Sequence, residues 1–201
     1  MQSNHYNVIE FPFTDSLFEM PKKQLRAYLK WFVEQITGRI IELNRVVTTT
    51  TGYEGWKADY SPESLKTLSE WFMQEVKENV QALKAKKVDA AMDSDKIPVD
   101  IRYFRALGGY RSESLCFDVG IYIYKMLITN VKPDIEWVQD LRNRRNLEFG
   151  QPMLNTSEHL YPTNPVGMVR TVALRFVDGG PDRITEVYKM IAGWCNDQPV
   201  D

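Results

Sequence analysis

Residues 111–131 read RSESLCFDVGIYIYKMLITNV and are the most continuously apolar stretch of the chain. Apolar side chains would lie on nearly every side of a helix drawn through them, and such a helix belongs in the interior of a bundle. Ser112 and Glu113 would supply a cap and an acidic first turn, and Gly108-Gly109 would break the chain before them. The stretch therefore predicts a central helix over about 111–130.

A buried strand is the alternative for the same residues, because Val119, Ile121 and Ile123 favour strands. The length of the stretch and its capping residues favour the helix. Asp118, Lys125 and the polar first turn interrupt it too often for a transmembrane helix, which needs roughly 20 apolar residues.

Asp118 lies in the middle of this apolar stretch. A buried carboxylate must be paired or hydrogen-bonded, or its pKa rises until it is neutral. One explanation is an ion pair with an arginine from another helix, such as Arg170, Arg175 or Arg102. The other is that Asp118 lines a polar pocket, where it holds a ligand or acts as a general acid. Gly120 would let a neighbouring helix approach closely in either case.

The composition indicates an ordinary globular protein. The chain has 201 residues, of which 43% are hydrophobic and 26% are charged, enough to bury one core in a single domain over 1–201. A formal net charge of -2 gives no general attraction to nucleic acids or anionic membranes. Two distant cysteines, Cys116 and Cys195, make no disulfide framework. The first residues contain no signal-peptide pattern, so we expect a cytoplasmic protein with no nucleic-acid or membrane partner.

The rest of the chain predicts further helices and two short strands. Residues 1–20 form an N-terminal arm that packs through its aromatic side chains. Apolar spacing and capping residues predict helices over 22–46, 61–87, 164–177 and 182–194, and strands over 135–138 and 151–154. We place the charged residues of the first helix on its outer face: Lys22, Lys23, Arg26, Lys30, Glu34, Arg39, Glu42 and Arg45. The predicted fold is mainly α, a single-domain helical bundle around the central helix with a minor two-stranded β element.

Two segments are candidate contact surfaces for a protein partner. The turn-rich segment 48–60 carries Tyr53, Trp56 and Tyr60, which we expect to be exposed, and tyrosine and tryptophan dominate binding hot spots. The segment 88–100 is acidic through Asp89, Asp93, Asp95 and Asp100. It lacks the glycine and the final glutamate of an EF-hand, so we expect no metal there. Ordinary solvated loops are the alternative for both segments.

The sequence contains none of the common catalytic motifs. HExxH, GxSxG, GxGxxG, CxxC and the phosphate-binding GxxxxGK[ST] pattern do not occur. The two histidines, His5 and His159, stand apart from any local metal or triad signature. We therefore expect no catalytic residues and no cofactor.

Four phrases carry a resemblance to a known group of proteins. They are FDVGIYI (117–123), Glu136-Trp137, FGQPML (149–154) and TNP (163–165), all in the second half of the chain. They resemble uncharacterised bacterial proteins of the polymorphic or contact-dependent toxin immunity type. The resemblance implies a cytoplasmic immunity protein that binds and blocks a cognate toxin domain without catalysis. An enzyme or small-molecule-binding helical protein with a polar pocket around Asp118 is the alternative, and a helical scaffold is a third possibility.

Overall fold

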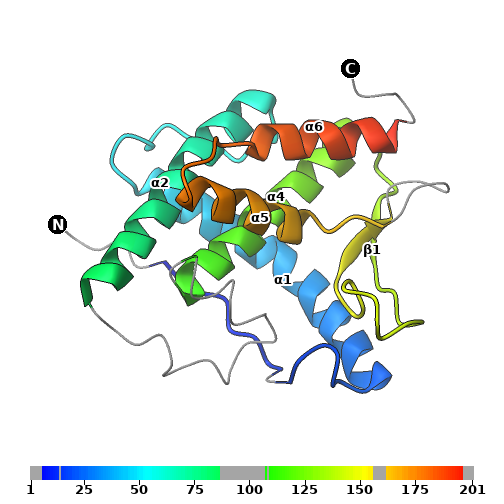
Figure 1. The fold of residues 1–201 in the computed structure, drawn as a ribbon. Helices are drawn as coiled ribbons and strands as arrows, with labels where there is room; N and C mark the ends of the chain where they lie inside the picture. The colour runs from blue at the N-terminus through cyan, green and yellow to red at the C-terminus, as the bar shows by residue number, and fades with distance from the viewer. Residues whose placement is uncertain (1–5, 14, 87–106, 108, 156–161, 197–201) are drawn as a thin grey trace.

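The computed structural model describes residues 6–13, 15–86, 107, 109–155 and 162–196. Figure 1 shows the arrangement of its elements. Five helices are described: α1 Lys22–Thr48, α2 Pro62–Lys86, α4 Tyr110–Asn130, α5 Pro165–Val177 and α6 Ile184–Cys195. Two strands, β1 Glu136–Val138 and β2 Met153–Asn155, pair antiparallel. The predicted mainly α fold with a minor two-stranded β element is confirmed.

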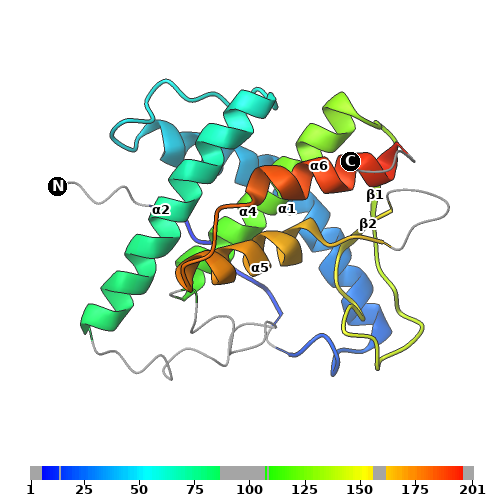
Figure 2. The ribbon, with the colours of Figure 1, turned by 45° about the horizontal axis from the view of Figure 1, so that its top comes forward.

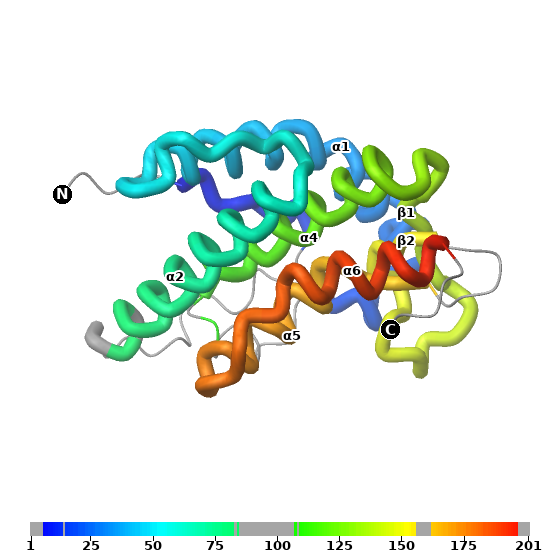
Figure 3. Tube along the Cα trace, turned by 90° about the horizontal axis from the view of Figure 1, so that it is seen from above, coloured from blue at the N-terminus to red at the C-terminus, as the bar shows by residue number. Residues whose placement is uncertain are grey.

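Helix α4 is the central element, as predicted. It contacts each of the other four described helices, and Figures 2 and 3 show it between α1 and the pair formed by α5 and α6. Its buried residues cover all sides of the helix, as its apolar sequence requires. One hydrophobic cluster joins residues from all five described helices and both strands. No helix in the described part of the chain is long and apolar enough to cross a membrane.

The first turn of α4 differs from the prediction. Gly109, at φ 93°, turns the chain, so the helix begins at Tyr110 and has no side-chain cap. The predicted Ser112 cap is wrong, because Ser112 already lies inside the helix. Its hydroxyl is fully buried and accepts a hydrogen bond of 3.2 Å from Asn79 Nδ2.

Two other helix starts follow the expected capping chemistry. Ser61 Oγ accepts a hydrogen bond of 3.1 Å from the backbone N–H of Ser64 at the start of α2. Asn164 Oδ1 accepts one of 2.9 Å from the backbone N–H of Gly167, with Pro165 at the first helical position of α5. Each cap satisfies one of the free N–H groups of a helix N-terminus.

Helices α4 and α5 approach closely at Gly120. A Cβ at this position would lie 2.6 Å from Val166 Cγ2 and 2.7 Å from Val166 Cα, which is closer than atoms of a real side chain can pack. The predicted role of Gly120 in a close helix approach is confirmed.

The N-terminal arm packs through its apolar and aromatic side chains, as predicted. Tyr6 and Ile9 belong to the main cluster. Leu17 and Met20 form a second cluster with three other buried residues, Leu25, Tyr28 and Phe149. The Phe11 ring lies 5.4 Å from the Trp31 ring, and the Phe13 ring 5.8 Å from the Tyr28 ring. The described residues before α1 contain no helix or strand.

The small sheet covers one part of α1 and α4. Trp137 of β1 pairs with Leu154 of β2 in the antiparallel register. The Trp137 ring is buried, 4.6 Å from Phe32 of α1 and 5.2 Å from Tyr124 of α4. The strand therefore contributes an aromatic side chain to the core between these two helices.

Candidate functional site

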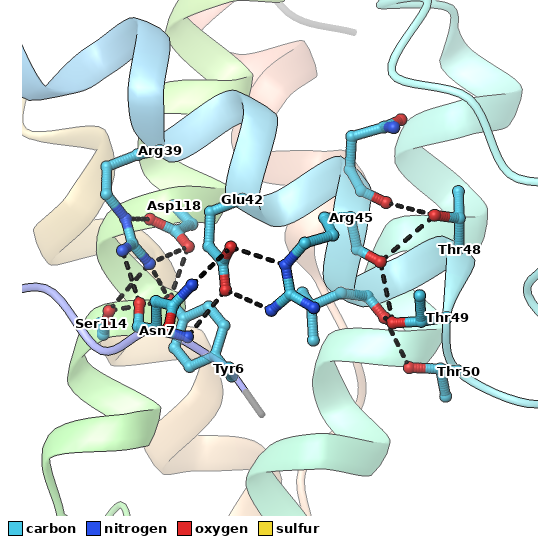
Figure 4. A network of polar contacts seen from close by, with 12 residues as sticks. Tyr6, Asn7, Arg39, Glu42, Arg45, Thr48, Thr49, Thr50, Ser114 and Asp118 are labelled. Carbon is cyan, nitrogen blue, oxygen red and sulfur yellow. Dashed lines mark hydrogen bonds and ion pairs between the residues drawn. The ribbon is translucent and has the colours of Figure 1, made fainter. Parts of the chain in front are cut away.

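Asp118 is paired in the core with Arg39 of α1. The carboxylate is 0% exposed and the arginine 7%. Arg39 Nε donates to Oδ1 and Nη2 to Oδ2, each at 2.7 Å, so the two groups share two parallel hydrogen bonds. The phenol of Tyr6, in the N-terminal arm, donates a third hydrogen bond of 2.5 Å to Oδ2. Figure 4 shows the three side chains converging from three segments of the chain.

Ser114 completes this buried network. It lies one turn before Asp118, so both side chains project from the same face of α4. The hydroxyls of Ser114 and Tyr6 are 2.7 Å apart, and Ser114 donates because the phenol gives its one proton to Asp118. Ser114 also accepts from the backbone N–H of Ile9 at 2.9 Å and from Arg39 Nη2 at 3.1 Å. Each polar atom of the network therefore has a partner.

The same face of α1 binds the backbone of the arm. Arg39 Nη1 donates to the carbonyl of Asn7 at 2.6 Å, and Glu42 Oε1 accepts from the Asn7 backbone N–H at 2.7 Å. Arg45 holds the Glu42 carboxylate with hydrogen bonds of 2.7 and 2.8 Å. Burial raises the pKa of Glu42, but the bonds from Arg45 and Asn7 outweigh burial and lower it.

The network is charged at neutral pH. Burial raises the pKa of Asp118 to about 6, against the opposing hydrogen bonds and charge of Arg39. Burial lowers the pKa of Arg39, but its bonds to Asp118 outweigh this and leave it raised. Burial and the nearby Asp118 charge raise the pKa of Tyr6 well above 10. Asp118 is therefore a carboxylate, Arg39 a cation and Tyr6 a neutral donor.

The predicted ion pair of Asp118 with an arginine from another helix is confirmed, but the partner is Arg39, not Arg170 or Arg175. Arg170 bonds Glu113, and Arg175 is exposed on α5, while Arg102 lies outside the described residues. Arg39 is also not on the outer face of α1, where we placed it together with Glu42. Its spacing from the buried residues Phe32, Ile36 and Leu43 puts it in the apolar stripe of the helix, and this was the signal available in the sequence.

Asp118 does not line a solvent-reachable pocket. Both of its oxygens are bonded, and Arg39, Tyr6 and the arm separate it from water. A general acid or ligand group needs access to a substrate. The sealed ion pair removes the main support for the alternative of a catalytic or ligand-binding pocket around Asp118.

The aromatic residues of the 48–60 segment occupy different environments. Trp56 is only 6% exposed and belongs to the main core, where its Nε1 donates to the Ser64 carbonyl at 2.9 Å. The expected exposure of Trp56 is therefore wrong, because an indole with an internal hydrogen-bond partner is more stable in the core. Tyr53 and Tyr60 are half-buried and pack against the same core.

Tyr60 shows how tightly this loop is held. Its φ of 62° lies in the left-handed region, which is uncommon for a residue with a bulky side chain. The Tyr60 backbone N–H donates to Tyr122 Oη at 3.1 Å, and its carbonyl accepts from Asn130 Nδ2 at 2.8 Å. Both partners lie on α4, so the central helix fixes the backbone of the loop.

The remaining candidates carry no site in the described part of the chain. The acidic residues Asp89, Asp93, Asp95 and Asp100 lie outside the described residues, as do His5 and His159. Among the side chains that the structure describes, no group of three or more His, Cys, Asp or Glu is arranged to hold a metal ion. Cys116 and Cys195 are free and buried, and burial raises the pKa of each thiol.

A second buried ion pair was missed in the sequence. Glu113 of α4 accepts from Arg170 Nε of α5 at 2.9 Å, and the Glu113 side chain is 2% exposed. Its position in a polar first turn gave no sign of burial, which arises from the docking of α5.

Comparisons with protein-family models, curated proteins and solved structures found no match to this chain.

Proposed function

We propose that this chain is a non-enzymatic protein-binding module, and within that class an immunity protein that binds and neutralises a cognate bacterial toxin domain. The observation that most favours a binding role is the ordered loop 49–61, which connects α1 to α2. In this loop Trp56 is buried in the core, while Tyr53 and Tyr60 are half-buried and partly accessible to a partner. The narrower assignment to immunity proteins rests on the resemblance in the second half of the chain. The proposal places the protein in the cytoplasm, where its buried thiols stay reduced.

The rigidity of the loop supports a role in recognition. Ordering a flexible segment on binding costs free energy, and a loop already held in place avoids this cost. Tyr60 is hydrogen-bonded to Tyr122 and Asn130 of α4. The Ala58 backbone N–H donates to Asn44 Oδ1 of α1 at 3.3 Å, so the loop is fixed to both α1 and α4. Tyrosines on such a frame are favourable anchors for a partner.

The loop also carries exposed charge. Hydrogen bonds from the backbone N–H groups of Glu54 itself and of Gly52 lower the pKa of the Glu54 carboxylate. Hydrogen bonds from Ser61 lower the pKa of Asp59. Both carboxylates stay ionised throughout the neutral range, and complementary charge on a partner speeds association. Glu54 and Asp59 outnumber the exposed Lys57 in this loop, so a toxin domain with a basic surface fits it. The acidic residues Asp89, Asp93, Asp95 and Asp100 remain a predicted second contact.

The test is binding and protection with the product of the adjacent upstream gene. The full chain is expected to co-purify with that protein and to restore growth of cells that express its toxin domain. Replacement of Tyr53 by alanine is expected to weaken the complex at least about tenfold, as at a hot spot. Leu147→Ala is the matched control, because Leu147 is an apolar residue 81% exposed in the segment between β1 and β2. Figure 1 shows this segment on the opposite side of the molecule from the loop between α1 and α2.

Two results would contradict the proposal at different levels. Failure of the chain both to bind and to protect would reject the immunity function. Binding and protection that Tyr53→Ala leaves unchanged would keep that function and reject the loop as its contact surface.

A further inference from the structure

The junction of α1, α4 and α5 contains a polar cluster separate from the Asp118 network. Glu113 and Cys116 project from α4, Arg170 from α5 and Tyr28 from α1. The charge of Arg170 acts on both Tyr28 and Cys116: burial raises the pKa of each, and Arg170 opposes that rise. These four residues are named the α1–α4–α5 junction below.

The hydrogen bonds of this junction are incomplete. Arg170 Nε bonds Glu113 Oε2, but Glu113 Oε1 is buried and has no hydrogen-bond partner. The structure shows no partner for the two terminal nitrogens of Arg170 among the residues that it describes. A buried acceptor without a partner costs about 1–3 kcal/mol, and such atoms point to a water, an ion or a ligand.

The close contact between Gly120 and Val166 explains why the junction is buried. Arg170 follows Val166 by one turn of α5, and Glu113 precedes Gly120 by two turns of α4. The close contact at Gly120 therefore places Arg170 beside the first turns of α4, where it bonds Glu113. Arg170 keeps 19% of its side chain exposed and Glu113 keeps 2%, so Arg170 is the more exposed member of the ion pair.

We propose that the α1–α4–α5 junction binds a neutral group that accepts a hydrogen bond from Arg170 and donates one to Glu113, as a carboxamide does. The charges of Glu113 and Arg170 cancel, and a charged ligand would bring an uncompensated charge into a buried site. A carboxamide offers a carbonyl acceptor and two N–H donors side by side. Such a group matches the free guanidinium nitrogens and the free carboxylate oxygen. This site is independent of the proposed toxin contact.

Three probes that share a phenyl ring and differ in charge test this assignment. Benzamide, benzoate and benzylamine present a neutral carboxamide, an anion and a cation. Titration of the full chain, followed by the backbone NMR signals of Glu113 and Arg170, gives the three affinities. Benzamide is expected to bind roughly tenfold more tightly than either charged probe, the difference that one hydrogen bond makes.

Glu113→Gln gives a readout that a merely structural role of Glu113 would not change. The substitution keeps the shape but removes the negative charge and the free carboxylate oxygen. The variant is expected to prefer benzoate over benzamide, because Arg170 is then unopposed. Arg175→Lys, at an exposed position of the same helix, is the control and is expected to keep the wild-type order of affinities.

Several outcomes would overturn the proposal that this junction binds a carboxamide. These are equal affinities for the three probes, a charged probe that binds best to the wild type, or a Glu113→Gln variant with unchanged preference. A crystal soaked in benzamide that shows only a water on Glu113 Oε1 would also overturn it. If Glu113→Gln does not fold, the wild-type order of affinities and the soaked crystal decide the question.

Discussion

Arg39 and Asp118 join α1 to α4 through two parallel hydrogen bonds of 2.7 Å inside the core. Tyr6 also donates a hydrogen bond to Asp118, so the same carboxylate holds the N-terminal arm. Burying two charges costs several kcal/mol per ion in desolvation, which their attraction offsets only with good geometry and further hydrogen bonds. Both conditions are met here, so the pair fixes how three segments pack.

Loss of either charge alone is expected to destabilise the fold strongly. Asp118→Asn leaves the Arg39 guanidinium buried without its counter-charge, and the expected cost is about 3–5 kcal/mol. Urea unfolding followed by circular dichroism measures this loss. The double variant Arg39→Met with Asp118→Leu removes both charges and is expected to recover most of the stability.

Arg26→Met is the control for the arginine side of this pair, because Arg26 lies on the exposed face of α1. It is expected to change the unfolding free energy by less than about 0.5 kcal/mol. A similar small change in Asp118→Asn would show that the ion pair contributes little to the fold.

Gly120 and Gly38 form a matched pair of helical glycines with opposite expectations. A Cβ at Gly120 would overlap the backbone of Val166, so Gly120→Ala is expected to destabilise the protein by about 1–3 kcal/mol. Gly38, in α1, has nothing within 4 Å of the same added atom, so Gly38→Ala is expected to stabilise it by about 0.5–1 kcal/mol. Thermal unfolding compares the two. Equal shifts would contradict the close approach of α4 and α5.

The sequence predicted the helices well because their signals are local. Ser61 and Asn164 cap helices where the pattern placed them, and the apolar run of α4 identified the central element. The least accurate boundaries are the start of β2, the start of α6 and the end of α1, each of which lies two residues from prediction. Short strands and single turns carry too few residues for a periodic pattern to fix them.

The partners of buried polar groups could not be predicted in the same way. Arg39 and Asp118 are 79 positions apart, and the sequence offered several arginines as candidates. The choice depends on how α1 and α4 rotate against each other, which packing decides. Trp56 was misplaced for a related reason, because its partner is a backbone carbonyl of α2 that no residue pattern identifies.

Alkaline pH is expected to unfold the protein through its buried tyrosines. Burial raises the pKa of Tyr28 and of Tyr122 to about 12, and that of Tyr6 well above 10. The unfolded chain loses these protons near pH 10 while the folded chain keeps them, so stability falls from pH 10 upward. Tyrosinate absorbance and circular dichroism are expected to change together. Ionisation of all ten tyrosines near pH 10 in the folded protein would contradict this.

Tyr122→Phe is expected to loosen the loop 49–61 and leave the core in place. Its hydroxyl lies 2.7 Å from Ser64 Oγ and accepts from the Tyr60 backbone N–H at 3.1 Å. Removal leaves the Tyr60 N–H without its partner, at a cost of about 1–3 kcal/mol, and the strained backbone of Tyr60 loses one of its two supports. Hydrogen exchange at Tyr60 and its neighbours is expected to become faster.

Tyr124→Phe is the matched control, since Tyr124 is half-buried on the same helix and packs by its ring against Trp137. It is expected to leave exchange in the loop unchanged. If the loop is also the toxin contact, Tyr122→Phe weakens that complex without touching the partner, because the loop must then be ordered on binding. Unchanged exchange at Tyr60 in Tyr122→Phe would mean that Asn130 and the packing of Trp56 suffice to hold the loop.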